Sequence, residues 1–85
     1  MPGIQKRRRD IDGEILRFLF EEDWPVTTEM VAKRLKISWN TAQVHLYKLT
    51  VSGLVKGKKV GRQNQWMITE KGRELLRKKR NSAHR

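Results

Sequence analysis

The chain has 85 residues, of which 20 are Lys or Arg and nine are Asp or Glu, so its formal net charge is +11. A chain of this length forms one small domain and leaves no room for a second hydrophobic core. The absence of cysteine excludes disulfide scaffolds and zinc fingers. No apolar run reaches the length of a membrane span or signal core, so we expect a soluble cytoplasmic protein without a membrane partner.

The charge is unevenly distributed along the chain. Eight basic residues and no acidic one lie between Met30 and Thr69, whereas six of the nine acids lie between Asp10 and Asp23. One face is therefore expected to be strongly positive, and a polyanion is its natural partner because each neutralised phosphate releases condensed counterions. A merely solvated basic surface or a polybasic membrane patch is the alternative. The organisation of the charge around a motif favours nucleic acid.

The chain divides into three parts: a flexible basic arm over 1–9, a folded domain over 10–80 and a frayed tail over 81–85. The first helix of the domain carries its apolar side chains at i, i+4, i+7 and i+8, namely Ile11, Ile15, Phe18 and Leu19. Leu16 and Phe20 lie on a different side of this helix. We favour their packing against a neighbouring helix or the hairpin; the alternative is an exposed stripe used for dimerisation.

A second helix is predicted after a short strand at Val26. Thr27 caps this helix, which runs to about Lys36. Its apolar stripe consists of Met30, Val31 and Leu35. Ala32 is expected where a neighbouring helix approaches closely.

A third helix is predicted over 38–52. Ser38 caps its start, and Gly53 suits a left-handed C-terminal cap. At about 100° per residue, one side of this helix must face the core, and that side contains Ala42, Leu46, Leu49 and Gly53. The opposite side contains Asn40, Val44 and Tyr47, with Gln43 on one flank and Lys48 on the other.

The apolar period changes from helical to extended after Gly53. The segments L-V-K-G-K-K-V and Q-W-M-I-T flank G-R-Q-N, which predicts a hairpin with a basic tip. Trp66 and Ile68 are expected to share its inner face, and Gly57 and Gly61 to let the hairpin adapt on binding. A final helix is predicted to start after a capping threonine, Thr69, and to turn Leu75 and Leu76 toward the core.

This order of elements is that of a winged helix-turn-helix, an α+β fold with a three-helix core, a two-stranded β-hairpin wing and a C-terminal helix. The segment V-A-K-R-L-K-I-S-W-N-T-A-Q-V-H-L-Y-K-L-T-V-S-G-L-V resembles the motif of small archaeal and bacterial winged-helix regulators. The segment I-T-E-K-G-R-E-L-L is similar to the start of the last helix in regulators of the MarR and PadR kind. The resemblance covers 10–80 and implies a transcription regulator that binds double-stranded DNA. One departure is Lys36, at a turn position usually filled by glycine, where a lysine has a modest conformational cost.

The outward side of helix 38–52 is the predicted reading surface in the major groove. Asn40 and Gln43 are the candidates for base contacts, because both amides can bond adenine in bidentate fashion, and Val44 can contact a thymine methyl group. The candidates for backbone contacts are Lys36, Ser38, Trp39, Tyr47 and Lys48. For one of them, Trp39, covering the turn before the helix is an equally good interpretation. Ordinary polar surface is the alternative for the whole side.

The wing over 56–64 concentrates four basic residues and no acid, namely Lys56, Lys58, Lys59 and Arg62. The resemblance implies that the wing follows the DNA backbone, with Arg62 in a narrow minor groove. A solvated hairpin is the alternative. Both ends of the domain carry basic runs that either contact phosphates or act as non-specific electrostatic aids: Lys6, Arg7, Arg8, Arg9, Arg77, Lys78, Lys79 and Arg80.

No catalytic constellation, cofactor motif or metal-ligand spacing is visible, so we predict neither an enzyme nor a metal site. His45, at the edge of the core side, is interpreted as a satisfied structural histidine. Two alternatives to a regulator are an architectural, nucleoid-type DNA-binding protein and a winged-helix module for proteins or RNA. The amides on helix 38–52 favour the regulator, since an architectural protein would place Lys and Arg there. A homodimer is expected for a regulator, and no small-molecule effector is evident.

Overall fold

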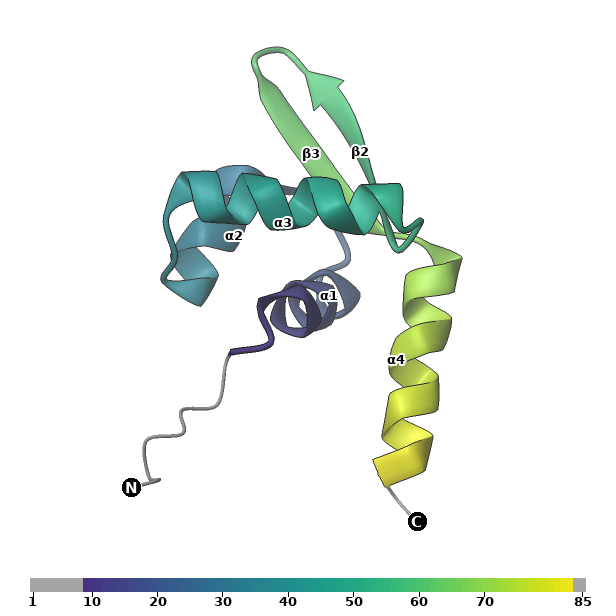
Figure 1. The fold of residues 1–85 in the computed structure, drawn as a ribbon. Helices are drawn as coiled ribbons and strands as arrows, with labels where there is room; N and C mark the ends of the chain where they lie inside the picture. Colours follow the sequence, from purple (N-terminus) through teal and green to yellow (C-terminus); the bar gives the residue numbers. More distant parts are fainter. Residues whose placement is uncertain (1–8, 84–85) are drawn as a thin grey trace, which may run out of the picture.

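A computed structural model describes the backbone of residues 9–83 and the side chains of residues 9–78. The predicted order of elements and the winged helix-turn-helix fold are confirmed (Figure 1): α1 (Ile11–Glu21), β1 (Val26–Thr27), α2 (Thr28–Leu35), α3 (Trp39–Val51), β2 (Val55–Val60), β3 (Gln63–Ile68) and α4 (Glu70–Ala83). The last helix continues three residues beyond the expected end of the domain. Figure 1 shows the hairpin projecting past α3 on one side, with α1 and α4 on the other side.

The three strands form one antiparallel sheet in the order β1-β3-β2. Val26 pairs with Trp66, and Val55 pairs with Ile68, so the short β1 closes the base of the hairpin. Trp66 and Ile68 are both buried, as expected for residues on one strand face. The sheet therefore attaches the wing directly to the core.

The core lies where α1, α2 and α3 meet the base of the sheet. The inner side of α3 is confirmed for Ala42, Leu46 and Leu49, all of which are buried. Gly53 was wrongly placed on that side: it lies beyond the end of α3, is exposed, and has the left-handed φ of 81° expected of a C-terminal cap. Met30 was also wrongly assigned to the core, since it is 44% exposed while Val31 is buried.

The caps predicted at Thr27, Ser38 and Thr69 are confirmed. At α1, Asp10 is the cap and accepts a hydrogen bond from the Gly13 N–H. The hydroxyl of Thr27 accepts from the Met30 N–H, and that of Ser38 from the Thr41 N–H. Thr69 accepts from the Gly72 N–H in the same way at the start of α4. These short polar side chains bond backbone donors that the first turn of a helix leaves free.

Gly57 is required by close packing and not by the freedom expected of it. It lies opposite Trp66 in the hairpin register. A Cβ atom at Gly57 would lie 2.5 Å from the indole ring, a distance that no side chain tolerates. The ring therefore covers the glycine, and the base of the wing is fixed.

The second apolar side of α1 is used inside the molecule. Leu16 is buried, which confirms the packing interpretation and leaves no exposed stripe at this residue. Phe20 is half-buried, and the guanidinium of Arg73 from α4 lies 5.7 Å from its ring centre. Together these contacts attach α4 to α1.

Candidate nucleic-acid interface

The outward side of α3 presents a mixed polar and apolar surface. Asn40 is exposed, and Val44 and Tyr47 are 57% and 56% exposed, as predicted. Val51, one turn further along, is 88% exposed. Val44, Tyr47 and Val51 follow the spacing i, i+3, i+7, so the periodicity that located the core would also have indicated Val51.

A groove separates α3 from the wing. Tyr47 meets Trp66 edge to face, with ring centres 6.0 Å apart and planes at 89°. The groove is lined by Tyr47, Thr50, Gly57, Lys58, Lys59, Asn64 and Trp66. Thr50 and Asn64 were not singled out from the sequence, because only the hairpin register places Asn64 opposite Lys59 and beside α3. The two aromatic rings fix the position of the wing relative to α3.

The basic residues of the wing lie on both of its faces. Side chains alternate along a strand, so Lys59 shares the face of Gly57, which turns toward Trp66, while Lys56 and Lys58 belong to the opposite face. All three lysines are exposed, as is Arg62 in the turn between β2 and β3. The wing can therefore approach a polyanion with either face or with its tip.

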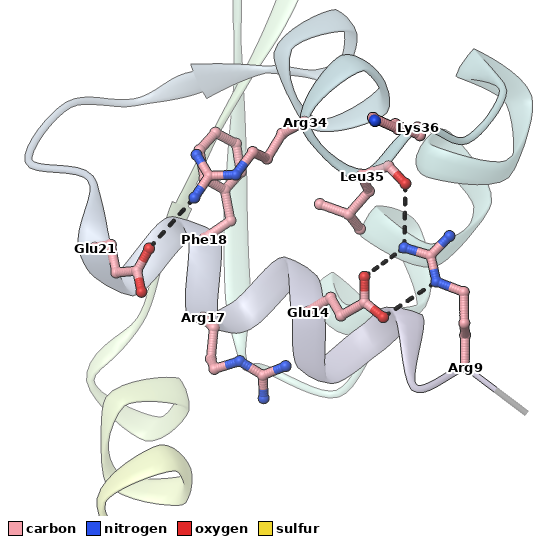
Figure 2. A pocket seen from close by; sticks show the side chains of 8 residues that line it. All are labelled: Arg9, Glu14, Arg17, Phe18, Glu21, Arg34, Leu35 and Lys36. Atoms are coloured by element: carbon pink, nitrogen blue, oxygen red, sulfur yellow. Dashed lines mark hydrogen bonds and ion pairs between the residues drawn. The ribbon is translucent and has the colours of Figure 1, made fainter. Parts of the chain in front are cut away.

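The turn between α2 and α3 contains a residue in a strained conformation, and hydrogen bonds hold the turn in place. Lys36 has a φ of 59°, and its N–H and that of Ile37 return to carbonyls of α2. Figure 2 shows Arg9 bonding Glu14 of α1 and donating to the carbonyl of Leu35 at 3.1 Å. The hydrogen bond from Arg9 lowers the pKa of Glu14 and raises the pKa of Arg9. Arg9 thus fixes the end of α2 from which the turn into α3 begins.

The start of α3 is free of negative charge. Its first turn contains no acidic residue, and Ser38 is engaged with Thr41 through both its cap and a hydroxyl–hydroxyl bond of 2.9 Å. Trp39 is 51% exposed, so half of its surface is available to a ligand. Free N–H groups and the helix dipole make such an end favourable for a phosphate.

A carboxylate of α1 holds the flank of α3. Asp12 Oδ1 lies 2.6 Å from His45 Nδ1, and Asp12 Oδ2 lies 3.8 Å from the ammonium of Lys48. His45 therefore has the structural partner expected of it. Lys48 is 60% exposed in its side chain and pairs only loosely, so its ammonium can exchange this partner for a phosphate.

Gln43, on the other flank of α3, is half-buried and hydrogen-bonded. The hydroxyl of Thr28 donates to its carbonyl oxygen Oε1 at 2.9 Å, and the indole N–H of Trp66 donates to that hydroxyl at 2.9 Å. The sequence gives no signal for Thr28, which follows the capping threonine and reads as an ordinary first residue of a helix. A chain of hydrogen bonds therefore connects the wing, α2 and α3.

Most of the basic side chains at the two ends of the domain lie outside the described residues. Lys6, Arg7 and Arg8, and the side chains of Lys79 and Arg80, lie outside the described residues. Within α4, Arg77 pairs with Glu70 at 3.6 Å and with Glu74 at 3.5 Å, while Lys78 is exposed. Figure 1 places α4 on the side of the molecule away from the hairpin tip.

The described residues contain neither a membrane-spanning helix nor a cluster of metal ligands. Over 9–83, none of the helices combines the length and apolar character needed to cross a bilayer. In the same part of the chain, no three acidic or histidine side chains come together as metal ligands would.

Comparisons with known proteins agree with this geometry. A family model described as winged helix-turn-helix matches residues 6–84. No curated protein matches the chain at a significant level. Among solved structures, ZitR of Lactococcus lactis, a zinc-responsive MarR family member, is 28% identical with a TM-score of 0.72, over 94% of this chain and 55% of that one. The transcriptional regulator BldR of Sulfolobus solfataricus is also 28% identical with a TM-score of 0.72, over 80% of this chain and 50% of that one.

Two further structures are similar over shorter stretches. ZitR in complex with DNA is 29% identical with a TM-score of 0.66, over 76% of this chain and 45% of that one. A HOP2 structure, described as giving insights into DNA recognition and protein interaction domains, is 25% identical with a TM-score of 0.64, over 69% of this chain and 98% of that one. The chain spans about half the length of the ZitR and BldR chains.

Proposed function

The chain belongs to the winged helix-turn-helix family, and on that premise we propose that it is a transcription regulator that binds double-stranded DNA. Helix α3 enters the major groove, and the wing over 56–64 lies on the backbone with its tip at the minor groove. Such a protein acts on the nucleoid. Binding to DNA, and not catalysis, is its activity.

The observation that carries the proposal is the exposed surface formed jointly by α3 and the wing. It contains amide, apolar and basic side chains, and the sequence has no acid between Met30 and Thr69. The carboxylates of α1 lie behind α3, where Asp12 bonds His45 and Glu14 bonds Arg9. A surface of this kind attracts phosphates and still offers groups that distinguish bases.

The proposed contacts follow from exposure and position. Asn40, Gln43 and Val44 face the base edges. The backbone contacts are Lys36, Ser38, Trp39, Tyr47 and Lys48 on α3 and its turn, and Lys56, Lys58, Lys59 and Arg62 on the wing. The basic run of α4 is not among the proposed DNA contacts, because Arg77 has carboxylate partners and α4 lies away from the hairpin tip (Figure 1).

The solved relatives support this function. BldR is a transcriptional regulator, and ZitR has been solved with DNA. A single winged helix reads only a short site, so we propose that two copies bind half-sites about one helical turn apart. The architectural alternative is favoured by one observation, the net charge of +11 on 85 residues, which supports binding without base preference.

Asn40→Ala tests base reading by α3. Asn40 is exposed, so its loss should leave the fold intact while removing a bidentate contact worth about 1–3 kcal/mol on a preferred site. The measurement is the affinity of wild type and variant for a preferred duplex and for random duplexes at one salt concentration. Random duplexes are the internal control, on which the variant should bind like the wild type. Equal losses on both would contradict base reading and favour the architectural protein.

A further inference from the structure

We infer that Gln43 reads its base through amide N–H groups alone and therefore selects guanine and not adenine. The inference rests on the proposed function, because it requires α3 to lie in the major groove. It replaces the expectation that Gln43 bonds adenine in bidentate fashion. Its basis is the hydrogen-bond chain from Trp66 through Thr28 to Gln43.

The direction of every bond in that chain is fixed by the chemistry of Trp66. An indole N–H is only a donor, so the hydroxyl of Thr28, at 2.9 Å, accepts from it. The single proton of the hydroxyl then points to the remaining partner, the amide of Gln43, also at 2.9 Å. A group that receives this proton must be an acceptor, so Gln43 turns its carbonyl oxygen Oε1 inward.

Burial removes the opposite orientation of the amide. Thr28 and Trp66 are each only 3% exposed. If the NH₂ group of Gln43 faced the hydroxyl, Thr28 would accept twice and its own proton would have no acceptor among the described residues and no access to water. An unsatisfied donor in such a place is strongly disfavoured.

The chain of bonds is also held rigidly in place. Trp66 is confined by Gly57 against the face of its indole and by the ring of Tyr47, which lies perpendicular to it. Thr28 is the first residue of α2, directly after its capping threonine. Rotating the amide of Gln43 therefore means breaking its bond to the buried hydroxyl of Thr28 while Thr28 and Trp66 stay fixed.

The inward carbonyl decides which base edge Gln43 can satisfy. Reading adenine needs an oxygen that accepts from its N6 amino group and a nitrogen that donates to N7. Guanine presents two acceptors, N7 and O6, to which an NH₂ group alone can donate. Opposite adenine, the N6 amino group would meet another donor. Asn40 is exposed, so both its amide oxygen and its amide nitrogen can contact a base, and Asn40 can still bond adenine in bidentate fashion.

The test begins with sites selected from random duplex DNA by the wild-type protein. The base pair read by Gln43 is the position that loses its preference in Gln43→Ala. At that position, wild type should prefer guanine to adenine by at least about fivefold. Replacing guanine by 7-deazaguanine, which lacks the N7 acceptor but keeps O6, should weaken this preference.

Gln43→Glu is the decisive variant, because it keeps the shape and the bond to Thr28 but turns an acceptor outward. Its preference at the same base pair should move to cytosine, whose N4 amino group donates. The added charge weakens binding to every duplex equally, so bases are compared within the variant. Thr28→Ser, which retains the hydroxyl, is the matched control and should keep the guanine preference. Thr28→Val removes the hydroxyl, so the amide of Gln43 should rotate freely and the variant should bind adenine as well as guanine at this base pair. If Thr28→Val does not fold, the result with Gln43→Glu alone tests the inference.

Adenine preferred by the wild type at this position would overturn the inference and leave the proposed function intact. So would an enriched motif in which Gln43→Ala changes no position, or a Gln43→Glu protein that keeps the wild-type preference. If no motif is enriched at all, sequence-specific binding fails, and the inference fails with it.

Discussion

At the scale of single residues, Lys36 shows local strain placed next to the proposed interface. Its φ of 59° is a left-handed conformation that costs a residue with a Cβ about 1–2 kcal/mol. The turn keeps this shape because α2 and α3 both pack on the core and because Arg9 holds the carbonyl of Leu35. A lysine at this position adds a positive charge beside the start of α3.

Lys36→Gly should therefore stabilise the fold. Relief of the left-handed strain exceeds the extra backbone entropy that glycine loses on folding, so we expect a gain of roughly 0.5–1 kcal/mol in the free energy of unfolding. Urea denaturation followed by circular dichroism measures it. The matched control is Lys33→Gly inside α2, which should destabilise by about 1 kcal/mol. A loss of stability in Lys36→Gly similar to that of the control would contradict the account of the turn.

The role of a single residue could be predicted from the sequence where it depends only on local chemistry. The caps at Thr27, Ser38 and Thr69 follow from hydroxyl chemistry at helix starts and are confirmed. Thr28 and Asn64 could not be predicted, because their roles depend on which residues the fold brings opposite them. Gly57 was predicted for the wrong reason, since only the register reveals the indole above it.

At the scale of elements, the wing and α3 form one rigid unit. The ring of Trp66 contacts Tyr47 of α3, and its N–H bonds Thr28 of α2. The tip, by contrast, carries Arg62 into solvent. A rigid base with an exposed cationic tip is suited to following a DNA backbone while α3 occupies the adjacent groove.

Arg62→Ala should weaken binding to all duplexes and reduce the slope of log affinity against log salt by about one unit. The reason is the loss of one cation that displaces condensed counterions. Arg17→Ala is the matched control, since Arg17 is an exposed arginine on α1, and α1 lies on the side of α3 opposite the hairpin tip (Figure 1). Affinities measured over a series of salt concentrations give the slopes. An Arg62→Ala slope equal to that of wild type would place the tip away from DNA.

Helical periodicity predicted the helices themselves better than it predicted which residues near their ends are buried. It located the inner side of α3 at Ala42, Leu46 and Leu49. It failed for Met30, which lies to one side of the buried stripe of α2, and for Gly53, which lies beyond the end of α3. Periodicity assumes that a helix continues, and it cannot show where packing stops.

At the scale of the whole molecule, the fold separates charge. Acidic residues of α1 lie behind α3, where they bond His45, Lys48 and Arg9. The surface of α3 and the wing keeps its basic groups exposed and free of nearby acids in the sequence. This separation steers a polyanion to one side of the molecule and presents α3 to it.

The central claim is that this side binds double-stranded DNA and distinguishes its sequence. Selection from random double-stranded DNA near physiological salt tests it most directly. We predict an enriched short motif, repeated at a spacing of about one helical turn if two copies bind together. Retention of DNA without any enriched motif would contradict sequence reading, and failure to retain DNA would contradict the proposed function itself.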